Sequence, residues 1–338
     1  MNAITQSIAS TPRGSGMAHG PQSAFAHAFT MALDSHPRQL SPKYLYDAEG
    51  SAWFARICEL PEYYLTRTEV GILRTFGREI SHCIGPHAEL IEFGAGPSTK
   101  LRVLLDHLQE PMRYCPVDIS GDHLKAESRR LKTDHPWLRV QPIEADFLRP
   151  FKWPAVRRGS GPRGRRVGML LGSSLGNFDQ DEARAFLCNA HQMMPGGAML
   201  IGVDLVKDPS VLHAAYNDVA GVTAAFNLNL LARANRELNA TFDLGRFFHH
   251  ACYRPDERCV EMHLISQTRQ MVQVCGYDFL FDEGETLHTE TSRKFTVSEL
   301  QHLASSCGWH PGPVWTDVQG WFALQWLESQ DSRHLLHA

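Results

Sequence analysis

The strongest indication of the fold of this chain is the stretch Leu90–Lys100, LIEFGAGPSTK. A short apolar run ends in Glu92 and leads into a Gly-Ala-Gly turn, and the polar residues after the turn can open a helix. A strand, a glycine-rich turn and a helix in this order form the nucleotide-binding corner of doubly wound α/β proteins. The stretch therefore predicts a parallel sheet with a nucleotide-containing ligand at the end of one strand.

A regular alternation of strands and helices surrounds this turn. Apolar runs predict five short strands, at 89–94, 113–118, 138–143, 167–172 and 198–205. The spacing of apolar residues predicts helices from Thr68 onward and over 99–108, 120–131 and 179–194. Strands that alternate with helices at this spacing indicate a parallel, doubly wound α/β sheet.

Helix-start signals and a final hairpin complete this pattern. The signals are Ser120 alone, Asp179 with Glu182, and Thr296 with Glu299. Residues 312–327 predict two antiparallel strands joined near Gly320. The alternation breaks only after residue 206, where one or two helices over 214–238 and a strand pair within 252–276 are expected. The break predicts an insertion with a fold of its own.

Composition and charge exclude several classes of partner. The chain has 338 residues and a formal net charge of −4, so neither a nucleic-acid nor a membrane partner is expected. The longest apolar stretch, 198–203, is too short to span a bilayer. Residues 1–20 are polar, and we interpret them as a disordered leader rather than a secretory signal. A cytoplasmic protein is the expectation, and a monomer because no heptad pattern is present.

Cysteines and histidines predict no metal site. The eight cysteines contain no CxxC pair, which indicates free thiols in a reducing compartment. The pair His249–His250 has no accompanying HExxH motif, and we interpret it as a surface pair. The basic stretch Arg157–Arg166 predicts a loop, as a solvated insertion in preference to an RNA-binding patch.

The residues after the predicted strands distinguish between nucleotide ligands. A GxxxxGK[ST] phosphate loop is absent, and Thr99 occupies the position of the third glycine of the dinucleotide fingerprint, which argues against NAD. Asp118 can accept both hydroxyl protons of a ribose, while Asp146 and Phe147 can bind the amine and the ring of adenine. S-adenosylmethionine, which has no phosphate, fits best, although generic strand-end carboxylates would give the same pattern.

At this point several motifs become recognisable. They are LPEYYLTRTE (60–69), FGAGPSTKLR (93–102), GSSLGNF (172–178), VEMHL (260–264), TETSRKFTVSEL (289–300) and the long segment 202–238. From about Leu40 to Leu327 the chain resembles the L-histidine Nα-methyltransferase family of ergothioneine biosynthesis. The resemblance implies transfer of three methyl groups from S-adenosylmethionine to the α-amine of L-histidine, giving hercynine.

The resemblance also implies a fold and a domain organisation. The expected fold is α/β, a Rossmann-like class I methyltransferase sheet with parallel strands and a C-terminal antiparallel hairpin, plus a second α+β domain that binds the amino acid. The methyltransferase domain would comprise residues 69–206 and 294–331. The substrate-binding domain would comprise residues 21–68 and 207–293.

Carried over position by position, the resemblance implies two groups of site residues. The cofactor S-adenosylmethionine would be bound by Tyr46, Gly94, Lys100, Asp118, Asp146 and Phe147. The substrate L-histidine would be bound by Tyr63, Gly172, Asn177, Tyr216, Met262, Glu290 and Ser292.

Family roles assign these residues to parts of the substrate. Asn177 and Tyr216 would bind the carboxylate without an arginine, which keeps additional positive charge away from the sulfonium. Glu290 and Ser292 would bind the imidazole. As our own hypothesis, Tyr46 first and Tyr216 second assist deprotonation of the amine through hydrogen bonds or a water, with bulk solvent as the final proton acceptor.

The chain departs from the usual family pattern at five positions: Ala95, Pro97 and Leu101 in the cofactor turn, and Leu65 and Arg293 elsewhere. Three alternatives stay open beside the histidine assignment. They are a methyltransferase for another amino acid or small amine, an NAD-linked oxidoreductase, and a non-catalytic protein that binds S-adenosylmethionine. The retained Glu290 and Met262 favour histidine.

Overall fold

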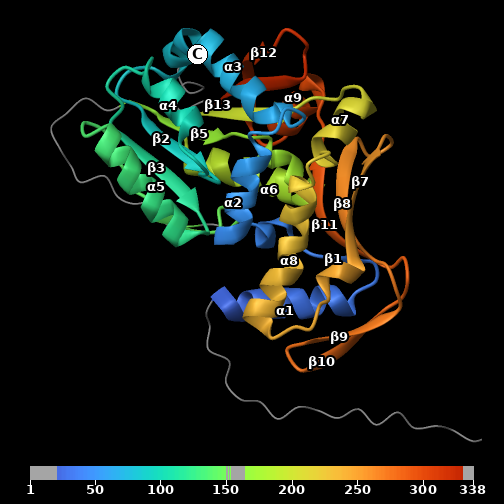
Figure 1. Cartoon of the computed structure of the whole chain (residues 1–338). Coiled ribbons are helices and arrows are strands. Elements are labelled where there is room, and N and C mark those ends of the chain that lie inside the picture. Colours follow the sequence, from blue (N-terminus) through green and yellow to red (C-terminus); the bar gives the residue numbers. More distant parts are fainter. Residues whose placement is uncertain (1–20, 150, 152, 154–163, 330–338) are drawn as a thin grey trace, which may run out of the picture.

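The computed structural model describes residues 21–149, 151, 153 and 164–329. The predicted leader 1–20, and residues 157–163 of the predicted basic loop, lie outside this part of the chain. Figure 1 shows a large sheet with helices on both faces, and a smaller sheet built mostly from the orange to red part of the chain. Among the described residues, no helix has both the length and the apolar character needed to span a bilayer.

The large sheet has the strand order β12-β13-β6-β5-β2-β3-β4. Its strands are β2 (Glu89–Phe93), β3 (Arg113–Asp118), β4 (Ile143–Glu144), β5 (Arg166–Leu170), β6 (Ala198–Asp204), β12 (Trp309–Thr316) and β13 (Phe322–Ser329). The first five pair in parallel, and β13 joins β6 and β12 antiparallel. Every residue of β2 and β6 is buried, as expected for parallel strands covered on both faces. The predicted fold class and the final hairpin are confirmed.

The third predicted strand is much shorter than expected. Only Ile143–Glu144 pair with β3, and Val140 makes an isolated bridge to Tyr114. Between them lies Pro142, which has no N–H to donate to the ladder. The proline therefore confines β4 to a short strand at the edge of the sheet.

Helices cover the large sheet on both faces, as the alternating pattern predicts. Buried side chains of α3 (Tyr64–Ile84), α4 (Thr99–Leu105) and α5 (Gly121–Asp134) belong to one core cluster. Buried side chains of α6 (Gln180–Met193) and α9 (Val297–Ser305) belong to a second cluster, on the opposite face. Grouping by face in this way is the arrangement of a doubly wound sheet.

The predicted capping residues have mixed outcomes. Both predicted capping boxes are present: Asp179 with Glu182 at α6, and Thr296 with Glu299 at α9. Ser120 occupies the N-cap position of α5, but its side chain makes no capping hydrogen bond. The Asp118 carboxylate instead accepts the Ser120 backbone N–H at 2.7 Å. This bond closes the turn between β3 and α5.

The smaller sheet has the order β1-β11-β8-β7. Its strands are β1 (Arg38–Gln39), β7 (Phe247–Arg254), β8 (Cys259–Ser266) and β11 (Thr286–Arg293). Around it lie α1 (Pro21–Asp34), η1 (Pro42–Leu45), α2 (Ala48–Ile57), η2 (Ser174–Asn177), α7 (Pro209–Tyr216), α8 (Val222–Leu238), η3 (Leu244–Arg246), β9 (Gln270–Val274) and β10 (Tyr277–Phe281). Helix α8 packs on β7 and β8, and Figure 1 shows it beside this sheet. The predicted insertion thus forms two helices and most of one sheet.

The N-terminal part of the chain also enters the smaller sheet. Strand β1 pairs in parallel with β11, and α2 packs against α8 of the insertion. Residues before the large sheet and residues of the insertion therefore share one structural unit. The exact division of the chain into two domains at the boundaries given above stays a prediction.

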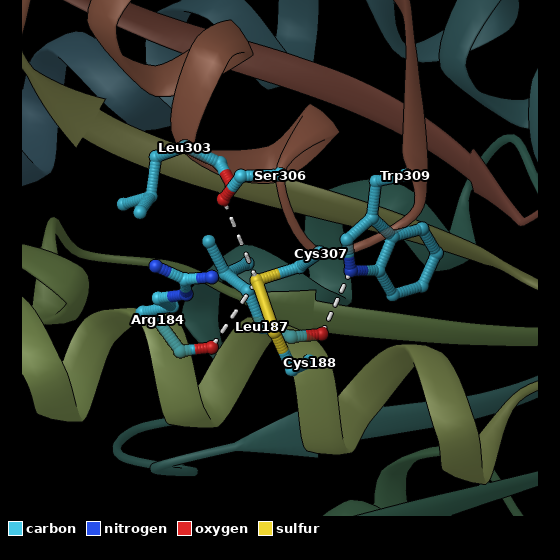
Figure 2. Close-up of a disulfide and its surroundings, with 7 residues drawn as sticks. All are labelled: Arg184, Leu187, Cys188, Leu303, Ser306, Cys307 and Trp309. Carbon is cyan, nitrogen blue, oxygen red and sulfur yellow. Dashed lines mark hydrogen bonds between the residues drawn. A yellow bond between two sulfur atoms is a disulfide. The ribbon is translucent and has the colours of Figure 1, made fainter.

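Two cysteines form a disulfide, which corrects the expectation of free thiols throughout. Cys188 on α6 is bonded to Cys307, which follows α9 directly, with their Cα atoms 4.6 Å apart. Figure 2 shows this bond beside Trp309, whose indole N–H donates to the Leu187 carbonyl at 2.9 Å. The other six cysteines are free, and α6 and α9 are covalently joined on their face of the sheet.

A buried carboxylate joins the two sheets. Asp204 ends β6, and its carboxylate accepts hydrogen bonds from Tyr64 at 2.7 Å and Lys207 at 2.6 Å. It also pairs at 2.9 Å with Lys294, just after β11. A backbone hydrogen bond adds to this ion pair, since the Phe295 N–H donates to the Asp204 carbonyl at 2.9 Å. The end of β11 is therefore held against β6, an interior strand of the large sheet.

We predict that Asp204→Asn lowers the free energy of unfolding by about 3–5 kcal/mol, because two lysines lose the charge that compensates them in the interior. Urea unfolding would measure the loss. Glu257→Gln is the matched control, since Glu257 forms an exposed pair with Arg254 at 3.9 Å. This variant should lower the free energy of unfolding by less than about 1 kcal/mol. Similar losses in the two variants would contradict the central role of Asp204.

Candidate functional site

The glycine turn after β2 has the conformation that the sequence predicts for a ligand-binding corner. Gly94 has φ +69°, in the left-handed region that favours glycine. A Cβ atom built on Gly94 would lie 3.5 Å from the Phe147 ring. The structure thus brings Gly94 and Phe147, both predicted to bind the cofactor, to the same end of the large sheet.

Two predicted carboxylates lie at the ends of the neighbouring strands. Asp118 ends β3, and Asp146 follows β4, so both are at the carboxyl edge beside Gly94. Ligands of open parallel sheets bind at this edge. The Asp146 carboxylate pairs with Lys43 of η1 at 3.3 Å. Sequence reasoning missed Lys43, for which no pattern in the sequence was available.

A buried carboxylate connects the cofactor turn with the substrate residues. Glu69 on α3 pairs with Lys100 at 2.6 Å, and both of its oxygens accept the Gly172 N–H, at 2.9 and 3.0 Å. A Cβ atom on Gly172 would lie 2.8 Å from the Lys100 ammonium nitrogen. The predicted cofactor residue Lys100 and the predicted substrate residue Gly172 are therefore neighbours. Glu69 itself was missed, although it ends the motif LPEYYLTRTE.

The three predicted tyrosines lie close together. The rings of Tyr63 and Tyr216 are 6.3 Å apart between centroids, and Phe54 contacts both Tyr46 and Tyr63, at 5.4 and 6.1 Å. Burial raises the pKa of each of the three phenols above its usual value. These hydroxyl groups stay protonated at neutral pH, so they act as hydrogen-bonding groups rather than as phenolate bases.

The predicted imidazole partner has a free acceptor atom. Glu290 on β11 is buried and is paired in register with Met262 on β8. Burial raises its pKa to about 7, against the opposing charge of Lys294. Its Oε2 atom is shielded from solvent and has no hydrogen-bond partner among the described residues. A buried acceptor without a partner is suited to an N–H donor of a ligand.

A buried lysine lies behind the predicted substrate residues. Lys294 donates to the Tyr216 hydroxyl at 2.9 Å and to Ser292 Oγ at 2.8 Å, besides its pair with Asp204. Burial alone would lower the pKa of Lys294, but Asp204 and Tyr216 outweigh burial and raise it, so the ammonium stays charged. This corrects the expectation that positive charge is kept away from the site. The lysine belongs to the motif TETSRK, but only the fold shows that it points inward.

Asn177 approaches the site from the large sheet. It ends η2, which packs on β11, the strand that carries Glu290 and Ser292. The approach is close, because a Cβ atom on the preceding Gly176 would lie 2.6 Å from the Arg293 carbonyl oxygen. Asn177 and the imidazole residues therefore come from different sheets to one place.

The departures from the family pattern fall largely in the core. Ala95, Leu65 and Leu101 are all buried, and Leu65 and Leu101 belong to one hydrophobic cluster. Apolar side chains at these positions are therefore part of the hydrophobic interior. The turn keeps its backbone contact with β3, because Gly94 and Ala95 both donate to the Val117 carbonyl.

One family model and several known proteins are similar to this chain in sequence. A family model described as histidine-specific methyltransferase, SAM-dependent, matches residues 25–329. The chain is 40% identical over 299 residues to a histidine N-alpha-methyltransferase of Mycolicibacterium smegmatis, covering 86% of this chain and 91% of that protein. For the protein of the same description from Mycobacterium tuberculosis, the identity is 38% over 298 residues, with the same two coverages. Ergothioneine biosynthesis protein 1 of Neurospora crassa is 28% identical over 298 residues, which cover 83% of this chain and 32% of that protein.

We predict that Lys100→Met raises the Kd for S-adenosylmethionine about 10- to 100-fold, because a charged partner of the ligand carboxylate is lost. Calorimetry would measure this value. The double variant Lys100→Met with Glu69→Gln removes both charges and should bind as weakly without leaving a buried carboxylate unpaired. Lys125→Met, in an exposed pair with Glu144, is the control and should bind normally. Normal binding by the double variant would remove Lys100 from the cofactor site.

Proposed function

Because the chain belongs to the family of histidine-specific, S-adenosylmethionine-dependent methyltransferases, we propose that it methylates the α-amino group of L-histidine. Three transfers would give the trimethylated product hercynine, the first intermediate on the route to ergothioneine. The observation that carries the choice of amino acid is the buried Glu290 carboxylate, whose Oε2 atom has no hydrogen-bond partner in the described part of the chain. An imidazole N–H supplies the donor that this atom lacks.

The hydrogen bonds around Lys294 support a binding mode for the substrate. All three ammonium protons are used, on Asp204, Tyr216 and Ser292. The two hydroxyl groups also bond each other at 2.7 Å, which uses one of their two protons. One hydroxyl proton therefore remains for a ligand acceptor, and we assign it to the substrate carboxylate through Tyr216.

This assignment gives each predicted substrate residue a role. Tyr216, polarised by Lys294, binds the carboxylate together with Asn177. Glu290 accepts one imidazole N–H, and the Ser292 oxygen, whose own proton is used on Tyr216, accepts the N–H of the other ring nitrogen when the imidazole is protonated. Met262, the register partner of Glu290, packs against the ring, and Tyr63 forms a wall beside Tyr216.

The cofactor residues fit S-adenosylmethionine in chemistry. Gly94 lets the cofactor approach the backbone closely, and Lys100 offers a cation to its methionyl carboxylate. Asp118 is placed for the ribose hydroxyls, and Asp146 with Phe147 for adenine. S-adenosylmethionine supplies a methyl group on a sulfonium, which the amine nitrogen takes as the carbon–sulfur bond breaks, leaving S-adenosylhomocysteine.

The chain's own contribution to the reaction is mainly positioning and removal of water. Before each transfer the amine must lose a proton. The phenol of Tyr46 is protonated, so it orients the amine and passes the amine's proton toward solvent through hydrogen bonds. Tyr46 is the first candidate for this role and Tyr216 the second, since the Tyr216 hydroxyl already accepts a hydrogen bond from Lys294. The trimethylated product has no lone pair, and the reaction stops there.

The function is tested by incubating the protein with S-adenosylmethionine and each of the twenty amino acids, followed by mass spectrometry. We expect histidine alone to gain up to three methyl groups. Methylation of a different amino acid would show that this chain is a related methyltransferase with another side-chain pocket. No methylated product would refute the proposal. A cytoplasmic, monomeric protein without a nucleic-acid partner remains our expectation.

For Glu290→Gln we predict two opposite effects from one change. Histidine binding weakens about 10- to 100-fold, because a charged acceptor of the imidazole is lost. The free protein becomes more stable than wild type at pH 8, by on the order of 2 kcal/mol. The folded pKa of Glu290, about 7, exceeds its ordinary value of 4.5, so the native state binds the extra proton between these values. The free energy of unfolding of the wild type therefore decreases as pH rises through this window. The variant has no carboxyl group at this position, so it does not lose this part of its stability.

Calorimetry with histidine and urea unfolding at pH 5 and pH 8 would measure the two effects. Glu283→Gln, in the exposed loop after β10, is the matched control and should change neither. If Glu290→Gln bound histidine as wild type does, the imidazole would have to be recognised elsewhere. If its stability gain were equal at the two pH values, the raised pKa would be wrong.

A further inference from the structure

The smaller sheet has a second face, which the proposed reaction does not use. Along β8 the buried Met262 lies between Glu261 and His263, which are only partly buried. Successive side chains of a strand point to opposite faces, so Glu261 and His263 lie on the face away from Met262 and Glu290. On β7, Cys252 pairs in register with Glu261. These three side chains therefore share the outer face of the sheet.

Their ligand atoms converge. A thiol sulfur of Cys252, a carboxylate oxygen of Glu261 and a ring nitrogen of His263 all lie within 4.8 Å of one another. In a tetrahedral zinc site, bonds of about 2.0–2.3 Å place the ligand atoms about 3.3–3.8 Å apart. Small rotations of the three side chains would bring them to that spacing. Among the described residues, this is the one such group of three.

The histidine of this cluster is prepared to act as a ligand. Its Nδ1 atom is shielded from solvent and has no hydrogen-bond partner among the described residues. Its Nε2 atom lies 3.3 Å from Glu261 Oε2. The ring is held from the other side by His288, with the two ring centroids 5.0 Å apart.

We propose that Cys252, Glu261 and His263 form a binding site for Zn²⁺, with water or His250 in the fourth position. Sulfur, nitrogen and oxygen donors together suit zinc better than the hard cations Mg²⁺ and Ca²⁺, which take oxygen ligands. His250 is exposed and stands opposite His263 in the register of β7 and β8. The cation would tie β7 to β8 on the face opposite the substrate residues, so it takes no part in methyl transfer.

Cobalt provides a direct test, because a tetrahedral cobalt site with a thiolate ligand has characteristic absorption bands. The full-length protein, treated with a chelator and kept free of thiol reductant, would be titrated with Co²⁺ and then with Zn²⁺. We expect one equivalent of Co²⁺ to produce a thiolate charge-transfer band, and Zn²⁺ to displace it. Cys252→Ser should abolish the band, and His263→Ala should raise the Kd at least tenfold.

Cys275→Ser is the matched control, since Cys275 is an exposed free cysteine outside the cluster, and it should retain the band. Should Cys252→Ser fail to fold, alkylation of wild-type Cys252 would be followed by mass spectrometry, with protection by Zn²⁺ expected. Unchanged alkylation, or a cobalt spectrum that survives in folded Cys252→Ser, would overturn the proposal. Methyl transfer by Cys252→Ser should equal that of wild type, so this test is independent of the proposed function.

Discussion

The buried ion pair between Asp204 and Lys294 is the contact on which the arrangement of the two sheets depends. Both side chains are fully shielded from solvent and lie 2.9 Å apart. A charge in the interior without its partner would cost several kcal/mol, so Lys294 cannot be buried at this place unless Asp204 reaches it. Asp204 ends the interior strand β6, and Lys294 follows β11, so satisfying the pair places the end of β11 against the large sheet. Tyr216 and Ser292 take their positions from the same lysine.

Glu69 makes a comparable connection on the other side of the site. It pairs with Lys100 of the cofactor turn and accepts the Gly172 N–H, so α3 holds the ends of β2 and β5 together. Glu290 differs from these two carboxylates, because no lysine of the described part of the chain pairs with it, and burial raises its pKa to about 7. Asp204 and Glu69 are thus neutralised by lysines, whereas the Glu290 carboxylate is incompletely compensated and is left for a ligand.

The smaller sheet serves two purposes through the alternation of its side chains. Buried residues of β8 and β11, such as Met262, Glu290 and Ser292, share one face of this sheet and line the proposed substrate site. Residues that point outward on β7 and β8 gather Cys252, Glu261 and His263. A single strand can therefore contribute to methyl transfer on one face and to cation binding on the other without either set of residues disturbing the other.

Sequence alone determined what depends on neighbouring residues and on motifs. Apolar runs, capping pairs and the glycine turn after Phe93 predicted the parallel sheet, its helices and the final hairpin, because these signals act over a few residues. They overestimated the length of the strand predicted at 138–143, because Pro142 has no N–H to donate to the neighbouring strand. The motifs named the family and nominated Glu290 and Tyr216. Only the tertiary structure decided that Lys294 stands behind Tyr216, that Glu69 joins Lys100 to Gly172, and that Cys188 meets Cys307. Each of these contacts joins residues far apart in the chain or depends on which way a side chain points, and such contacts exist only after the sheets have packed.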